Sequence, residues 1–94
     1  MKQTKIIIIG AGIIGCAVAF ELAKKGYRVV VIDKNDEVGS GSTANSCAIV
    51  RTCYSTYQGV ALAYEGVFYW RDWKNYVEHK DERGFAEYID CGML

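Results

Sequence analysis

The chain has 94 residues, of which 51% are apolar and none is proline, and its 11 Lys and Arg balance 11 Asp and Glu. This length suits one small domain and excludes a multidomain enzyme within these residues. The zero net charge gives no electrostatic support for binding to nucleic acid or to an anionic membrane, so neither partner is expected. The four cysteines form no C-x-x-C pair and His79 is the single histidine, so we predict no metal site and a reduced, cytoplasmic protein.

The N-terminus carries an apolar stretch, residues 6–20, that follows Lys2 and Lys5 and imitates a signal peptide. About 15 residues are fewer than the roughly 20 that a membrane-spanning helix needs, so we expect no membrane span. Three glycines interrupt the stretch at positions that have another use, described below, and this favours a cytoplasmic chain. A secreted chain stays the alternative.

The first third of the chain predicts a strand, a glycine turn, a helix and a second strand. Residues 5–9 are a largely β-branched run without alternation, which is typical of a parallel strand buried on both faces. Residues 13–25 place apolar side chains along one helical stripe, and Gly26 is expected to end that helix. Residues 27–32 form a second apolar run that stops at Asp33. The predicted fold class is α/β, a Rossmann-like βαβ unit with a right-handed crossover.

The pattern in the rest of the chain, from residue 35 onward, predicts a polar loop, a long helix and a short strand. Residues 35–45 are rich in small polar residues and cannot build a core. Residues 58–79 follow the three- and four-residue apolar steps of a helix, and their aromatic side chains widen its apolar face. The alternation in residues 85–89 indicates an edge or half-buried strand, and residues 91–94 add a strand-and-turn signal.

Gly10, Gly12 and Gly15 form a G-x-G-x-x-G motif at the predicted corner between strand and helix. Gly10 allows a tight turn, Gly12 lets a diphosphate approach the backbone because it has no Cβ, and Gly15 allows the helix to pack closely on the strand. The phosphates would then meet the unpaired N–H groups and the positive dipole end of the helix, at Ile13 and Ile14.

Asp33 follows Gly15 by 18 residues, at the end of the second predicted strand. Its carboxylate can accept hydrogen bonds from the ribose hydroxyls of an adenosine and would repel a 2′-phosphate, which disfavours NADP. The adjacent Lys34, which we include among the candidate cofactor-binding residues, weakens that argument. Strand, glycines, helix, strand and acid occur in the required order, so the sequence predicts a dinucleotide site. The motif by itself does not separate NAD from FAD.

A resemblance to a known family, carried partly by the loop after Asp33, distinguishes FAD from NAD. Residues 8–16, 21–26, 39–43 and 48–51, with the strand that ends at Asp33, resemble the N-terminus of the FAD-dependent D-amino-acid oxidase family. Within that family the most similar branch is that of the sarcosine, glycine and dimethylglycine oxidoreductases. The resemblance implies FAD as the cofactor, a flavin that carries out the hydride chemistry, and a two-domain flavoprotein fold that is incomplete in this chain.

In that family the small polar loop after the second strand runs along the FAD diphosphate and ribityl chain. The resemblance therefore implies four further cofactor-binding candidates, Ser40, Gly41, Ser42 and Thr43. Short side chains and exposed N–H groups suit phosphate oxygens. The alternative is a surface loop without a ligand.

Arg51 is the candidate substrate-binding residue, also through the resemblance. In sarcosine oxidases an arginine in a similar setting pairs with the substrate carboxylate, and a guanidinium fork suits such a bidentate contact. Ala44 and Ala48 replace basic residues of that family's loop, so the substrate need not be sarcosine itself. A solvated or structural charge is the alternative for Arg51.

These observations divide the chain into residues 1–57, the unit that binds the ADP half of FAD, and residues 58–94, a helix and the start of a strand expected to continue into a missing portion. We expect the N-terminal FAD-binding segment of an oxidoreductase that oxidises the C–N bond of a small amine or amino acid. Alone it would be inactive, as a fragment, a truncated product or one piece of a split enzyme with a complementing chain. An NAD-binding dehydrogenase fragment and a small non-catalytic subunit are the alternatives. No catalytic residue is assigned.

Overall fold

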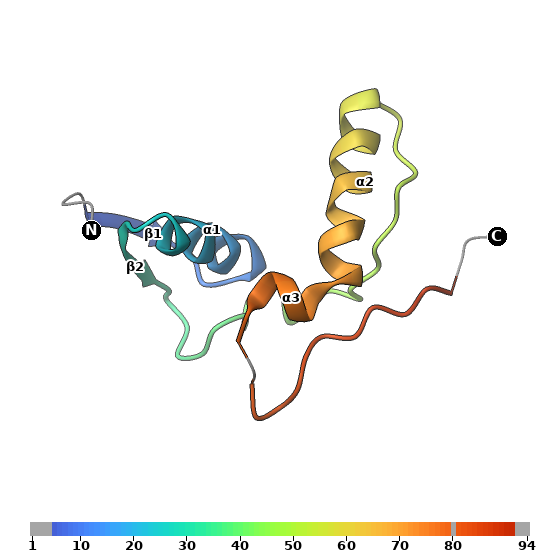
Figure 1. The fold of residues 1–94 in the computed structure, drawn as a ribbon. Coiled ribbons are helices and arrows are strands. Elements are labelled where there is room, and N and C mark those ends of the chain that lie inside the picture. The colour runs from blue at the N-terminus through green and yellow to red at the C-terminus, as the bar shows by residue number, and fades with distance from the viewer. Residues whose placement is uncertain (1–4, 80, 92–94) are drawn as a thin grey trace. The chain divides into compact units, whose positions relative to one another are not determined.

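The computed structural model describes residues 5–79 and 81–91 (Figure 1). Its elements in chain order are β1 (Lys5–Ile9), α1 (Ile13–Lys24), β2 (Arg28–Ile32), α2 (Tyr57–Arg71) and α3 (Trp73–Val77). They belong to two compact units, Met1–Ala48 and Ile49–Leu94. Lys2 of the signal-like pattern and residues 92–94 of the predicted strand-and-turn signal lie outside the described residues. Within those described, no helix is both long enough and apolar enough to span a bilayer.

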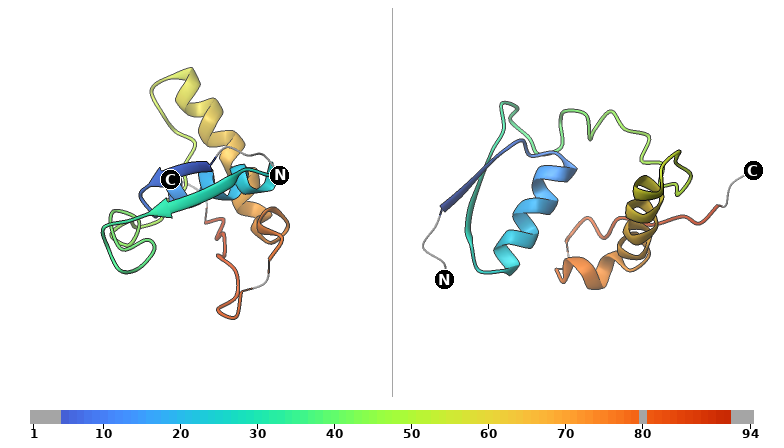
Figure 2. Two further views of the ribbon diagram at one scale, coloured as in Figure 1. Left: turned by 90° about the vertical axis from the view of Figure 1, so that its left-hand side faces the viewer. Right: turned by 90° about the horizontal axis from the view of Figure 1, so that it is seen from above.

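The first unit is the parallel βαβ unit that the sequence predicts. β1 and β2 are hydrogen-bonded neighbours in parallel register, with Ile7 opposite Val30 and Ile9 opposite Ile32. α1 connects the two strands and packs against one face of the pair (Figure 2). The α/β fold class is therefore confirmed, and β1 has the predicted bounds.

Gly26 ends α1 as predicted, although the helix stops one residue earlier than expected, at Lys24. The Gly26 backbone has a φ of +87°, a left-handed conformation that glycine adopts without steric cost. Its N–H donates to the Ala23 carbonyl at 3.0 Å, and the Tyr27 N–H donates to the Leu22 carbonyl at 3.1 Å. This pair of bonds is the Schellman arrangement, which satisfies the last carbonyls of a helix and turns the chain into β2.

The two faces of the β1–β2 pair differ in burial, and here the expectation of strands buried on both faces is wrong. Ile6 and Ile8 are half-buried on the face that α1 covers, where the Ile8 side chain reaches Gly15. On the opposite face Ile7 is 58% exposed and Ile9 is 88% exposed. A parallel sheet buries both faces only when helices cover both. The described residues of this unit, 5–48, supply a single helix, α1, so the apolar face that carries Ile7 and Ile9 stays exposed.

In the second unit, the part of the chain that the structure describes forms two helices where one was predicted. The Thr56 hydroxyl caps α2 by accepting a hydrogen bond from the Gly59 N–H at 3.1 Å. The helix then breaks at Asp72, whose carboxylate accepts a hydrogen bond from the Asn75 side chain at 2.8 Å. The Asp72 backbone has a φ of −121° and a ψ of 43°, outside the helical range, so the hydrogen-bond pattern of α2 ends there. The single helix predicted over residues 58–79 is corrected to α2 and α3.

The strand predicted at residues 85–89 is also corrected, because these described residues are not paired as a strand. A strand needs a neighbour to bond with, and the described residues of this unit offer none. The segment is instead attached to α2 through side chains. Arg71 forms a solvent-exposed ion pair with Asp90 at 3.1 Å, and its guanidinium lies 5.8 Å from the centre of the Tyr88 ring.

Candidate nucleotide-binding site

The corner between β1 and α1, residues 10–15, is here called the glycine corner. The chain leaves β1 at Gly10, whose φ of +110° is a conformation that other residues rarely adopt. The Gly10 N–H donates to the carbonyl of Ile32 at 2.7 Å, at the end of β2. The corner is therefore fixed to the same edge of the sheet at which β2 ends.

Gly15 brings α1 into direct contact with the backbone of this corner. A Cβ at Gly15 would lie 1.9 Å from the Gly10 carbonyl oxygen, far inside van der Waals contact. The contact is with backbone, which cannot move aside as a flexible side chain can. A residue without a Cβ is therefore required, as the predicted close packing of helix on strand demands.

Asp33 lies on the glycine corner. One carboxylate oxygen accepts a hydrogen bond from the Ala11 N–H at 2.7 Å, and the other accepts one from the Asn35 N–H at 2.8 Å. The bond from Ala11, followed by that from Asn35, lowers the pKa of the Asp33 carboxyl, and the charge of Lys34 adds a smaller effect in the same direction. Asp33 is therefore ionised at neutral pH, with its charge held beside the corner.

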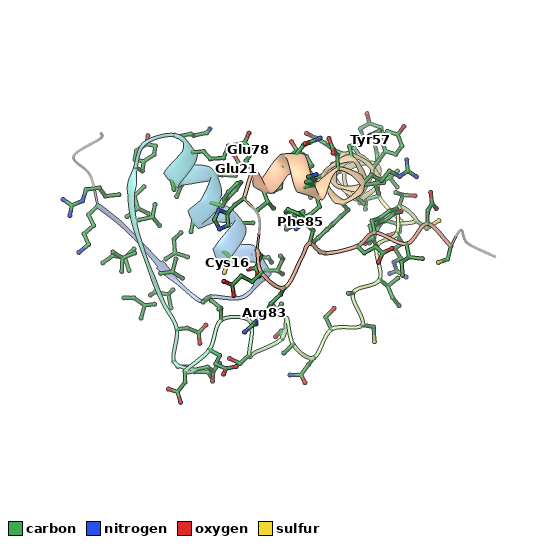
Figure 3. The ribbon with its side chains drawn as sticks, turned by 60° about the horizontal axis from the view of Figure 1, so that its bottom comes forward. Cys16, Glu21, Tyr57, Glu78, Arg83 and Phe85 are labelled. Carbon is green, nitrogen blue, oxygen red and sulfur yellow. The ribbon has the colours of Figure 1, made fainter. Side chains whose placement is uncertain are left out.

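Ala11 is the residue that the sequence analysis missed. It is buried, and its backbone binds both of the later segments of the site. Its N–H is bonded to Asp33, while its carbonyl accepts hydrogen bonds from the Gly39 N–H at 2.8 Å and from the Cys16 thiol at 3.5 Å. Cys16 projects from the first turns of α1 (Figure 3). The one available signal was the small side chain at the middle position of the G-x-G triplet.

The polar loop after β2 is bonded to the glycine corner at two points. Gly39 donates to Ala11, as above, and the Thr43 hydroxyl accepts a hydrogen bond from the Ile13 N–H at 2.9 Å. Within the loop, the Asn45 side chain donates to the Gly41 carbonyl at 3.1 Å and the Ser40 hydroxyl donates to the Glu37 carbonyl. The loop thus has a defined conformation on the corner.

The structure brings most of the predicted cofactor residues together in the first unit. Thr43 is half-buried against the corner, whereas the other candidates in the loop are exposed: Lys34, Ser40, Gly41 and Ser42. The Ile14 side chain is 78% exposed, and among the described residues no acceptor is recorded for its backbone N–H. Arg51 belongs to the second unit, where its guanidinium lies 5.2 Å from the centre of the Tyr54 ring.

A groove of about 610 Å³ begins at Ala11 and Asp33 and runs between α1 and β2. Its lining includes apolar side chains, among them Phe20 and Val31, and the carboxylates of Asp33, Asp36 and Glu37. Its volume is in the range typical of small-molecule sites. The lining residues include three carboxylates and no cation, so the groove suits an uncharged group better than a phosphate.

Within the described part of the chain, no group of three or more His, Cys, Asp or Glu residues is arranged to hold a metal ion. The chemistry that the site offers is therefore that of backbone N–H groups, a helix N-terminus and one ionised carboxylate. Such groups bind and orient a phosphorylated ligand.

Parts of the chain are similar in sequence to known proteins. The bifunctional protein MnmC of tRNA 5-methylaminomethyl-2-thiouridine biosynthesis from Legionella pneumophila (strain Corby) is 38% identical over 52 residues, which are 55% of this chain and 8% of that protein. Glycerol 3-phosphate dehydrogenase of Caloramator mitchellensis is 41% identical over 54 residues, which are 57% of this chain and 11% of that protein. The chain thus spans about a tenth of the length of these relatives. No solved structure is significantly similar to it.

The family model named DAO, FAD dependent oxidoreductase, matches residues 5–94. This match includes the glycine corner, Asp33 and the polar loop. It agrees with the family resemblance predicted from the sequence and favours FAD over NAD as the cofactor. Because the match extends over nearly the whole sequence, the chain belongs to the DAO family of FAD-dependent oxidoreductases.

Proposed function

We propose that this chain binds the ADP half of FAD within an oxidoreductase that oxidises the C–N bond of a small amine or amino acid. One observation carries the proposal: two later segments are hydrogen-bonded to the backbone of the glycine corner, more than 20 residues away in the sequence. These are Asp33 at the end of β2 and the loop that contains Gly39 and Thr43. Each supplies a group that an adenosine diphosphate needs, as described next.

The diphosphate is assigned to the N-terminus of α1, above Gly12. Gly12 presents no Cβ there, and the helix dipole and the first-turn N–H groups of Ile13 and Ile14 favour negative charge. Gly10 and Gly15 act indirectly, because they set the turn and the close packing that place those N–H groups. The exposed loop residues Ser40, Gly41 and Ser42 are assigned to the flank of the diphosphate.

The adenosine ribose is assigned to Asp33. Each carboxylate oxygen already accepts one backbone N–H, and each retains a lone pair for a ribose hydroxyl. The apolar groove beside Asp33 provides a place for the uncharged adenine ring. The carboxylates that line this groove oppose a 2′-phosphate, and the exposed Lys34 is not among the lining residues, which supports the argument against NADP.

When bound, FAD supplies the hydride acceptor for the substrate C–H bond. The contribution proposed for this chain is orientation of the cofactor and, through Arg51, recognition of a substrate carboxylate. The Arg51 guanidinium carbon lies 5.2 Å from the centre of the Tyr54 ring, and a guanidinium in such a cation–π contact can still donate N–H groups to a carboxylate. A sarcosine- or glycine-like acid is the substrate class that this residue favours.

The exposed face of the β1–β2 pair supports the proposal that catalysis requires more polypeptide than these residues provide. Ile7, Ile9, Val30 and Ile32 line that face, and all are more than a third exposed. We propose that the 94-residue chain alone binds FAD weakly and catalyses no amine oxidation. A complementing chain, or further residues of the same enzyme, would cover this face.

Direct binding measurements test the cofactor assignment. We propose isothermal titration of the chain with FAD, ADP and NADH, comparing Gly12→Ala with Gly66→Ala as the matched control. A Cβ at Gly12 meets the Thr43 hydroxyl at 2.9 Å, whereas a Cβ at Gly66 meets nothing within 4 Å. FAD and ADP are expected to bind the wild type and G66A, and G12A is expected to lose about tenfold in affinity. Equal binding by G12A, or NADH binding in preference to FAD, would contradict the assignment.

A further inference from the structure

The hydroxyl of Thr43 lies where the proposed diphosphate has to bind. It accepts the hydrogen bond of the Ile13 N–H at 2.9 Å, across 30 residues of sequence. The same oxygen lies 2.9 Å from the position that a Cβ of Gly12 would take. Thr43 therefore occupies the side of Gly12 that the absent Cβ leaves open.

This hydroxyl gives α1 a cap that its own residues do not provide. The residue at the N-cap position is Gly12, which has no side chain, and no local side chain caps the helix. Thr43 supplies the missing oxygen from the loop after β2. A hydroxyl at this position satisfies one of the N–H groups that a helix start leaves unpaired.

A phosphate oxygen placed above Gly12 would need the same N–H and the same space. Two acceptors cannot both make a short, linear hydrogen bond with one N–H. The charged oxygen is the stronger competitor, because a charge-assisted hydrogen bond is roughly twice as strong as a neutral one and the helix dipole favours an anion. An uncharged nucleoside brings no such oxygen.

We propose, on the basis of the function given above, that Thr43 closes the glycine corner in the ligand-free chain and that a nucleotide diphosphate binds by displacing its hydroxyl from Ile13. Thr43 then contributes to specificity, because only a ligand with a phosphate at this position replaces the cap. The displaced bond is solvent-exposed, so water can satisfy the Thr43 hydroxyl after release. The N-terminal part of the loop stays bonded to the glycine corner, through the hydrogen bond from the Gly39 N–H to the Ala11 carbonyl.

The test compares Thr43→Val with Thr43→Ser in titrations with ADP, inorganic pyrophosphate and adenosine. Valine removes the cap from the ligand-free state, so T43V is expected to bind ADP and pyrophosphate about fivefold more tightly than the wild type. Adenosine affinity is expected to be unchanged. T43S keeps the hydroxyl and is expected to behave like the wild type. Without ligand, amide hydrogen exchange at Ile13 is expected to be about fivefold faster in T43V than in T43S.

Other outcomes would overturn the proposal that a diphosphate displaces the Thr43 hydroxyl from the Ile13 N–H. Unchanged or weaker ADP binding by T43V would mean that the hydroxyl does not compete with the diphosphate. An equal gain for adenosine would place the effect away from the glycine corner. If T43V does not fold, the wild type decides: added ADP must shift the NMR resonances of the Thr43 side chain and leave the Gly39 amide protected, and an unshifted Thr43 side chain refutes displacement. Failure of the wild type to bind FAD or ADP would instead refute the proposed function.

Discussion

The carboxylate of Asp33 accepts a hydrogen bond from the backbone N–H of Ala11, 2.7 Å away and 22 residues earlier in the sequence. This bond joins the end of β2 to the middle of the glycine corner. It holds the carboxylate beside the start of α1, and it keeps the carboxyl ionised by lowering its pKa. One contact thus links the packing of the βαβ unit to the proposed recognition of a ribose.

Asp33→Asn tests the role of that charge in binding. The amide is nearly isosteric, but it offers one acceptor oxygen where the carboxylate offers two. FAD and ADP affinities are expected to fall about tenfold, because hydrogen bonds to charged groups are the stronger ones. Glu65→Gln, an exposed carboxylate on α2 that does not line the groove, is the control and is expected to bind normally. Isothermal titration measures both, and equal affinities for D33N and E65Q would refute the ribose assignment.

The pH dependence of folding follows from the same carboxyl group. Because its pKa is lower in the folded chain than in the unfolded chain, ionised Asp33 stabilises the fold. This stabilisation is complete above the ordinary carboxyl range near pH 4 and is lost as the pH falls through the depressed pKa of the folded state. The difference in Tm between wild type and D33N, measured by circular dichroism, is therefore expected to shrink from pH 6 to pH 2. A difference that does not shrink as the pH falls below 4 would show that the charge is not its source.

Gly15→Ala tests the close packing of α1 on the corner. The added methyl would lie 1.9 Å from the Gly10 carbonyl oxygen, so the helix or the turn must shift. We expect a loss of roughly 3 kcal/mol in the free energy of unfolding, at the upper end of the cost of overpacking. Gly41→Ala places its methyl in open space and is expected to change stability little. Urea denaturation distinguishes them, and a G15A variant as stable as G41A would contradict the observed packing.

Substitutions on the two faces of β1 test the exposed apolar face. Ile9 is 88% exposed, whereas Ile8 is half-buried against Gly15 on the face that α1 covers. Ile9→Lys is expected to keep the fold and to reduce binding of a hydrophobic dye, because it removes apolar surface from solvent. Ile8→Lys buries a charge and is expected to unfold the unit. Circular dichroism and dye fluorescence report both effects, and equal unfolding by the two variants would show that the Ile9 face is covered.

Short-range features of this molecule were predictable because they depend on residues close together in the chain. The β-branched run before Gly10, the spacing to Gly12 and Gly15, and the position of Gly26 predicted β1, the corner and the end of α1. Asp33 was predictable as well, since a parallel βαβ unit brings the ends of its two strands to one edge. The break at Asp72 was not, because the apolar helical periodicity continues across this residue and gives no sign of the non-helical backbone that Asp72 adopts.

Sequence alone therefore determined the βαβ unit, the glycine corner and the family to which the chain belongs. Only the tertiary structure decided that Thr43 pairs with Ile13, that Ala11 joins Asp33 to the loop, and that one face of the sheet is exposed. The physical reason is the separation in sequence between the residues that interact. Backbone conformation and periodicity are set by neighbouring residues, whereas a hydrogen bond across 30 residues or an exposed strand face depends on which segments the folded chain brings together.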